Sequence, residues 1–125
     1  MSKNILIVED DDVARRGLAE LLTHAGYNVL FSGTFEEGRR IMLEQTPDLL
    51  IADIRLGDFN GLQLLVDRPR FIPAIIMTGF HDEVLKAESV RLGAAYVVKP
   101  LSFPSFLTVV EHEMAKRASE AGPKA

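Results

Sequence analysis

The stretch "ILIVEDDD", residues 5–12, joins four apolar residues directly to four acidic ones. Apolar runs without an intervening polar residue are typical of strands that are covered on both faces, as in parallel sheets. Carboxylates crowded at the end of such a strand repel one another. Two interpretations are open: the acidic residues begin a helix, whose dipole favours them there, or a positively charged group binds among them.

The same pattern of short apolar runs recurs along the rest of the chain. After residues 5–8, strand-sized runs occur at residues 29–31, 49–52, 74–77 and 96–98. Segments with helical spacing follow them, and we expect helices at residues 12–25, 34–46, 62–68, 82–92 and 102–118. This alternation favours a parallel sheet with right-handed crossovers. We therefore predict an α/β fold, a flavodoxin-like doubly wound five-stranded parallel sheet with strand order 2-1-3-4-5 and helices on both faces.

Local signals set the ends of these helices. Thr34 and Glu37 have capping-box spacing, and Ser102 is placed to cap the last helix. Gly26 and Gly93 are placed to end the first and the fourth. In the first helix we expect an inward-facing stripe made of Val13, Leu18, Leu21, Leu22 and Ala25.

Composition limits the class of protein. The 125 residues, 47% of them hydrophobic, suit one globular domain, which we place at residues 1–118 with a tail or the start of a linker at 119–125. The 14 Lys and Arg against 18 Asp and Glu leave no positive excess, so we expect no direct nucleic acid binding by this domain. Without Cys there is no disulfide or thiolate site. No apolar run approaches the roughly 20 residues of a membrane span, and we expect a cytoplasmic protein.

Polar residues stand at the carboxyl ends of four of the five expected strands. Glu9 and Asp10 follow the first strand, Asp53 the third, Thr78 the fourth and Lys99 the fifth. In open parallel sheets of this kind, sites form in the crevice beyond these ends, at the point where the winding direction reverses. We therefore expect these side chains to share one site.

The residue types at this edge suggest a chemistry. Neighbouring strands lie about 4.8 Å apart, so Asp10 and Asp53 are close if their strands are adjacent. Oxygen ligands without His or Cys point to Mg²⁺. The Thr78 hydroxyl and the Lys99 amine suit the oxygens of a phosphoryl group, and a carboxylate can act as nucleophile and form an aspartyl phosphate. Asp53, directly after a hydrophobic strand, is the best candidate.

Four motifs together resemble a known family. They are "VEDD" after the first strand, "IADIRLGDFNGLQLL" around the third, "IIMTG" at the fourth and "YVVKP" at the fifth. Each motif alone is weak, but their order on successive strands is specific. From about residue 3 to residue 117, the chain resembles the receiver domain of bacterial two-component response regulators.

The resemblance implies a role for each site residue. Asp53 would be the phosphoacceptor, and Asp10 a direct ligand of Mg²⁺. Glu9 would act on the metal through water, and Arg55 would contribute its backbone carbonyl.

It also implies a switch beside the site. Thr78 and Lys99 would bind phosphoryl oxygens, and Tyr96 would be the aromatic residue that rotates when the site is occupied. The family further suggests a cis peptide bond between Lys99 and Pro100.

The function implied is a signalling switch, not a conventional enzyme. A histidine kinase, a phosphotransfer protein or a small phosphodonor would supply the phosphoryl group, and the domain would catalyse only its own phosphorylation and dephosphorylation. The surface of the fourth helix, fifth strand and fifth helix would then change shape and control a downstream protein or a covalently linked effector domain. A phosphorylation-dependent homodimer is also open.

Other classes of protein remain as alternatives. A Mg-dependent phosphatase-like hydrolase with an Asp nucleophile would want a second acid two residues after Asp53, where this chain has Arg55. A flavodoxin-like module for a phosphate-bearing cofactor would want backbone and hydroxyl donors where this chain has acidic residues. A degenerate receiver would act only by docking partners, and the complete set of expected site residues argues against it.

Simpler roles suit some of these residues. Asp11 and Asp12 are expected to begin a helix, and Gly61 to serve a left-handed or helix-leading turn. Tyr96 can also be ordinary core packing. We further hypothesise that Arg55 and Phe80 screen the acyl phosphate from water and set its lifetime.

Overall fold

The computed structural model describes residues 2–56, 59–99 and 102–120. Its strands are β1 (Asn4–Val8), β2 (Asn28–Ser32), β3 (Leu49–Asp53), β4 (Arg55–Leu56), β5 (Phe59–Asn60), β6 (Ala74–Thr78) and β7 (Ala95–Val98). Its helices are α1 (Asp12–His24), α2 (Phe35–Gln45), α3 (Gly61–Asp67), α4 (Glu83–Arg91) and α5 (Phe103–Glu120). The cis bond expected before Pro100 lies outside the described residues.

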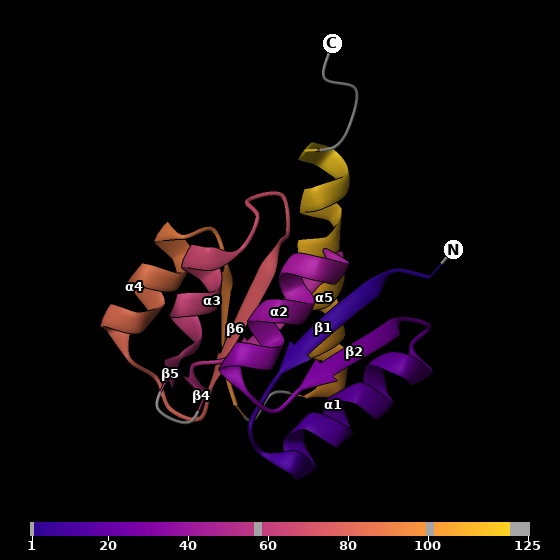
Figure 1. Ribbon diagram of the computed structural model, residues 1–125, viewed down its shortest axis with the longest axis horizontal. Coiled ribbons are helices and arrows are strands. Elements are labelled where there is room, and N and C mark those ends of the chain that lie inside the picture. Colours follow the sequence, from indigo (N-terminus) through magenta and orange to yellow (C-terminus); the bar gives the residue numbers. More distant parts are fainter. Residues whose placement is uncertain (1, 57–58, 100–101, 121–125) are drawn as a thin grey trace.

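Five strands form one parallel sheet in the order β2-β1-β3-β6-β7 (Figure 1). Because β6 and β7 are the fourth and fifth long strands of the chain, this confirms the predicted order 2-1-3-4-5. The register pairs Val8 with Ala52 and Asp53 with Met77. The residues that follow β1, β3 and β6 therefore lie at one end of the sheet, which we call the carboxyl edge.

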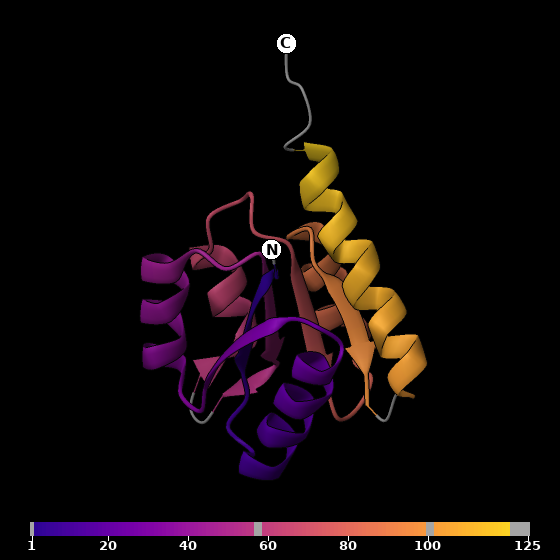
Figure 2. The ribbon, with the colours of Figure 1, turned by 90° about the vertical axis from the view of Figure 1, so that its right-hand side faces the viewer.

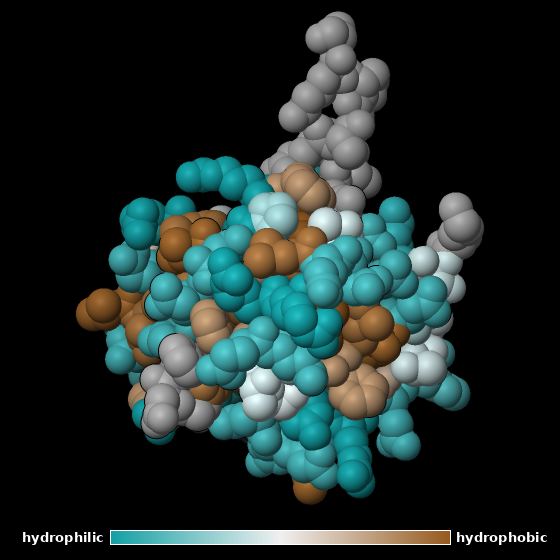
Figure 3. Space-filling view, in the orientation of Figure 1, coloured by the Kyte–Doolittle hydropathy of each residue, from teal (hydrophilic) through white to brown (hydrophobic). Residues whose placement is uncertain are grey.

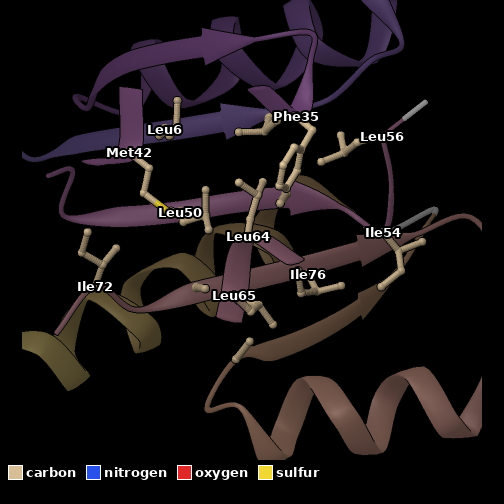
Figure 4. Close-up of a cluster of buried hydrophobic side chains, with 14 residues drawn as sticks. Leu6, Phe35, Met42, Leu50, Ile54, Leu56, Leu64, Leu65, Ile72 and Ile76 are labelled. Carbon is tan, nitrogen blue, oxygen red and sulfur yellow. The ribbon is translucent and has the colours of Figure 1, made fainter. Parts of the chain in front are cut away.

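Helices cover both faces of the sheet (Figure 2). On β1, Leu6 and Val8 belong to a buried cluster shared with α2 and α3, and Ile5 and Ile7 to a second cluster shared with α1 and α5. All four side chains are fully buried. Figure 4 shows the first cluster, in which Leu50 and Ile76 of the sheet pack against side chains of both helices. This two-sided burial explains the unbroken apolar runs of the inner strands β1, β3 and β6.

The predicted helix ends are confirmed at several caps. The Thr34 hydroxyl accepts from the backbone N–H of Glu37 at 3.2 Å, and the Ser102 hydroxyl from that of Ser105 at 3.3 Å. Gly26 and Gly93 follow α1 and α4 with φ of +101° and +86°, a conformation that strains residues with a side chain.

The predicted inward stripe of α1 is partly wrong. Leu22 is buried and Leu18 packs beside it, but Val13 is 81% exposed and Leu21 39%. Val13 stands roughly 140° around the helix axis from Leu18, so it cannot share its face. Ala25 is exposed because it caps the end of α1.

The short strands β4 and β5 were not expected. They form an antiparallel pair in which Arg55 lies opposite Asn60. Runs of two residues are too short to show the alternation that predicts a strand. This pair leads directly into α3, whose first residue is Gly61.

The surface is mixed in character. On the face that α2 and α3 cover, hydrophilic residues surround separate apolar spots (Figure 3). Within the described residues, no helix combines the length and the apolar character that crossing a membrane requires.

Candidate functional site

Three charged side chains from three distant segments meet at the carboxyl edge. The Lys99 ammonium lies 2.7 Å from Oε1 of Glu9 and 2.7 Å from Oδ2 of Asp53. Glu9 follows β1, Asp53 ends β3, and Lys99 follows β7. β6 lies between β3 and β7 in the sheet, so only a long side chain such as that of lysine can reach both carboxylates from the end of β7. The geometry thus brings together three of the five side chains that the sequence analysis expected at one site.

Burial governs the charges of this cluster. Glu9 is only 3% exposed, and this desolvation raises its pKa above the ordinary value of 4.5, although hydrogen bonds from Lys99 and from the backbone N–H of Asp11 oppose the rise. Burial alone would lower the pKa of Lys99, but its hydrogen bonds to Asp53 and Glu9 outweigh burial and raise that pKa. Lys99 is therefore held as a cation, and Glu9 is the group whose charged form is destabilised by burial.

We expect Glu9→Gln to stabilise the protein at neutral pH in the presence of a chelator, by about 1 kcal/mol, a size ordinary for single substitutions. A carboxyl with a raised native pKa keeps in the folded state a proton that the unfolded chain loses. The free energy of unfolding of the wild type therefore falls as pH rises above about 4.5. Urea unfolding from pH 4 to pH 8 should show the difference between the variants growing with pH and vanishing below pH 4.5.

Glu44→Gln is the matched control for that series. Glu44 is 52% exposed in its ion pair with Arg40, and surface pairs of this kind contribute little. We expect a change within about 0.5 kcal/mol at every pH. A Glu9→Gln protein less stable than the wild type at pH 7 would mean that the bond to Lys99 outweighs the cost of burial.

Backbone contacts hold the Asp53 carboxylate in place. Its Oδ1 accepts a hydrogen bond from the backbone N–H of Arg55 at 2.8 Å, so its two oxygens have different partners. The next residue, Ile54, donates its N–H to the Met77 carbonyl at 2.8 Å. Gly61 packs so closely that an added Cβ would lie 2.2 Å from the Asp53 carbonyl oxygen. Its φ is not positive, so of the two expected roles only the helix-leading one is right, and close packing is the reason for glycine.

Thr78 and Tyr96 lie on β6 and β7 and are both bonded to the loop that leads into α4. The buried Thr78 hydroxyl donates to the carbonyl of Phe80 at 3.0 Å. The Tyr96 hydroxyl accepts from the backbone N–H of Asp82 at 3.0 Å, and the ring of His81 meets the Tyr96 ring edge-on with centroids 5.8 Å apart. Both side chains therefore touch the same short loop.

Arg55 and Phe80 contact each other. The Arg55 guanidinium carbon lies 4.5 Å from the centre of the Phe80 ring, a cation–π distance. Phe80 is half exposed. The contact joins the segment after Asp53 to the loop after Thr78.

The sequence analysis missed Arg15. Its side chain, only 17% exposed, forms an ion pair with Asp12 and donates from Nη1 to the backbone carbonyl of Glu9 at 2.9 Å. An added Cβ on Gly33 would lie 2.8 Å from that Nη1. The spacing from Asp12 to Arg15, three residues along a helix, was the available signal.

Both interpretations of the opening acidic stretch are right, for different residues. Asp11 caps α1 by accepting from the Ala14 N–H at 3.0 Å, and Asp12 lies in the first turn. Glu9 instead faces the Lys99 cation.

The predicted Mg²⁺ site can be tested against the donors at this edge. Asp10 is exposed next to Glu9. In the described ranges, no three His, Cys, Asp or Glu side chains converge as a ready metal site. Between Glu9 and Asp53 stands the Lys99 ammonium, one positive charge for two carboxylates. These carboxylate oxygens fit Mg²⁺, which takes one or two carboxylates and keeps several waters.

The model of the response regulator receiver domain family matches residues 5–111. The chain belongs to this family.

Individual relatives agree with this assignment. The polar-differentiation response regulator DivK of Brucella anthropi is 31% identical over 121 residues, which are 89% of this chain and 95% of DivK. The transcriptional regulatory protein AfsQ1 of Streptomyces coelicolor is 33% identical over 101 residues, 78% of this chain. The match covers only 45% of AfsQ1, so the chain spans less than half of that relative.

Solved structures share the fold over nearly the whole chain. A CheY-like response regulator receiver domain protein from Methanospirillum hungatei superimposes with a TM-score of 0.92 at 27% identity, covering 97% of this chain and all of the other. The non-phosphorylated HemR receiver domain from Leptospira biflexa gives a TM-score of 0.82 at 29% identity, covering 91% of this chain and 95% of the other.

Proposed function

We propose that this domain is a phosphorylation-activated switch that accepts a phosphoryl group on Asp53. The observation that carries the proposal is the cluster in which Lys99 binds the carboxylates of both Asp53 and Glu9. A lysine beside a carboxylate nucleophile can neutralise the charge of a phosphoryl group that arrives there.

The transfer is a single displacement at phosphorus. One carboxylate oxygen of Asp53 forms a bond to phosphorus while the phosphorus–nitrogen bond of a phosphohistidine breaks. The imidazole leaves with the electron pair and takes up a proton. The signal ends by hydrolysis: water attacks the phosphorus of the acyl phosphate, which restores the Asp53 carboxylate and releases inorganic phosphate.

Mg²⁺, when bound, would neutralise negative charge on the phosphoryl oxygens. Asp10 and Asp53 are the side chains that would hold it directly, Glu9 would act through water, and Arg55 would offer its backbone carbonyl. Lys99 keeps its proton, as its raised pKa requires, and orients one Asp53 oxygen.

The switch would work through Thr78 and Tyr96. A phosphoryl oxygen would compete with the Phe80 carbonyl for the Thr78 hydroxyl. Tyr96 would then give up its hydrogen bond to Asp82 and move into the space that Thr78 leaves. Reversing a two-state population from 1:99 to 99:1 takes about 5.5 kcal/mol of differential binding. Two or three charge-assisted hydrogen bonds at about 1.5–3 kcal/mol each supply it.

The partners follow from this role. A histidine kinase or phosphotransfer protein would donate the phosphoryl group in the cytoplasm, and the surface of α4, β7 and α5 would control a downstream protein or a linked effector domain. The match covers 95% of DivK but only 45% of AfsQ1. A phosphorylation-dependent homodimer stays a prediction. Against a phosphatase-like hydrolase stands Arg55 at the position where that class needs an acid.

The proposal is tested by incubating the protein with acetyl phosphate and measuring its intact mass. With Mg²⁺ the mass should rise by one phosphoryl group, and peptide mapping should place that group on residues 49–55. With a chelator in place of Mg²⁺ the gain should disappear. A gain on another segment would move the acceptor and overturn the proposal.

Arg55 and Phe80 should control how long the phosphoryl group persists. Their side chains contact each other beside the segment after Asp53. If they screen the acyl phosphate, Arg55→Ser with Phe80→Ser should admit water and speed hydrolysis about tenfold, which is about 1.4 kcal/mol in the barrier. The decay is followed by intact mass after the phosphodonor is removed. Arg40→Ser with Leu43→Ser, an exposed pair of similar residues on α2, is the control and should leave the rate unchanged. An equal rate in both double variants would contradict the screening role.

A further inference from the structure

A hollow of about 550 Å³ lies at the end of the sheet opposite to Asp53. Residues before β6 and β7 line it, together with the ends of α3 and α4 and the later turns of α5. In both ribbon views these segments gather away from β4 and β5 (Figures 1 and 2). Its size is in the range of small-molecule sites, about 300–1,000 Å³, and its lining residues do not include Asp53, Thr78, Tyr96 or Lys99.

Four cations from three segments line this hollow. They are Arg68 after α3, Arg70 in the following loop, Arg91 at the end of α4 and Lys116 on α5. Among the described residues that line it, Glu113 is the one that carries a carboxylate. In a chain with a net charge of -4, such a concentration of positive charge is a local feature. This group of cations attracts anions, and guanidinium groups suit phosphate oxygens because they can donate two hydrogen bonds at once.

The arginines are held by the fold in different ways. Arg68 donates from Nη2 to the carbonyl of Leu92 at 2.8 Å, and a Cβ on Gly93 would come within 3.4 Å of the same nitrogen. Arg91 pairs with Glu88 at 2.6 Å. Arg70 is exposed and, among the residues that the structure describes, makes no hydrogen bond or ion pair. It is the cation most available to a ligand.

Glu113 is a buried carboxylate in the wall of this hollow. It is 1% exposed, and its Oε1 accepts from Lys116 at 3.0 Å. Its Oε2 is buried and receives no hydrogen bond within the described part of the chain. Leaving a buried acceptor unsatisfied costs about 1–3 kcal/mol. A ligand hydroxyl that enters the hollow can supply the missing donor.

We propose that this hollow binds a sugar phosphate, free or as part of a nucleotide. The phosphate would lie on Arg70 and its neighbouring cations, and a sugar hydroxyl would donate to Glu113. The site joins α3 to α4 and α5, so its occupant would brace the two helices of the proposed output surface.

The test is a titration of the full chain with three probes in the absence of Mg²⁺, at fixed ionic strength. The probes are orthophosphate, ribose 5-phosphate and AMP, and the readouts are calorimetry and the backbone amide shifts of Leu92 and Gly93 in NMR spectra. Ribose 5-phosphate should bind about tenfold more tightly than orthophosphate, because it adds the hydroxyl donor. If AMP binds more tightly than ribose 5-phosphate, the ligand is a nucleotide. If AMP binds no more tightly than ribose 5-phosphate, the ligand is a free sugar phosphate.

Two variants decide whether the hollow is the site. Arg70→Gln should weaken the binding of ribose 5-phosphate about tenfold, because one charge-assisted hydrogen bond is lost. Arg40→Gln, an exposed arginine on α2, should bind like the wild type, and so should Asp53→Asn. The proposal is overturned if no probe moves the Leu92 and Gly93 amides, if ribose 5-phosphate binds no tighter than orthophosphate, or if the two arginine variants behave alike.

Discussion

Asp53→Asn is expected to abolish phosphoryl incorporation from acetyl phosphate completely, while the protein stays folded. The amide replaces the carboxylate with a group of the same shape, but it is neutral and a poor nucleophile. Lys99 keeps one of its two carboxylate partners, Glu9, so the site loses its nucleophile without losing its cation. Intact mass measured after incubation with Mg²⁺ reports the result, and circular dichroism reports the fold.

A second carboxylate supplies the comparison for this experiment. Asp67 lies on α3 and forms a surface ion pair with Arg39 at 3.0 Å, outside the cluster of charged side chains. Asp67→Asn makes the same chemical change and should gain a phosphoryl group as the wild type does. A mass gain that survives in Asp53→Asn would place the acceptor elsewhere and remove the basis of the proposed switch.

The strands could be predicted because burial favours apolar residues along them, and their order followed from the flavodoxin-like arrangement. Residues 5–8 and 74–77 are covered on both faces, so each reads as an unbroken apolar run. Capping residues such as Thr34 mark helix ends through hydrogen bonds to their own neighbours. These signals are local in sequence, so they can be read before the fold is known.

Other features depend on contacts between distant segments. The sequence around Arg55 does not predict its contact with Phe80. The sequence around Lys99 does not predict that its ammonium bridges two carboxylates, which lie 46 and 90 positions away. Val13 has the right residue type for a core stripe, but the direction in which α1 meets the sheet decides its exposure. The sequence names the residues at the carboxyl edge, and packing decides which of them touch.

Gly61→Ala should cost at least about 3 kcal/mol of the free energy of unfolding, the upper part of the range for overpacking. The added methyl carbon would lie 2.2 Å from the Asp53 carbonyl oxygen, 3.0 Å from its carbonyl carbon and 3.2 Å from the Cα of Ile54. All three are backbone atoms, so no side chain can rotate away. Either α3 or the end of β3 must shift, and a shift of β3 moves the Asp53 carboxylate. Urea unfolding measures the first effect, and the rate of phosphoryl incorporation measures the second.

Gly17→Ala separates this close packing from the general effect of the substitution. Gly17 lies within α1, and a Cβ built there meets nothing within 4 Å. Alanine should therefore stabilise the helix by about 0.5–1 kcal/mol, since it has the higher helix propensity and the lower backbone entropy when unfolded. The two alanine variants should move stability in opposite directions, and only the one at Gly61 should slow phosphorylation. If Gly61→Ala were as stable as the wild type and equally fast, the close approach of α3 to Asp53 would not be what holds the carboxylate at the carboxyl edge.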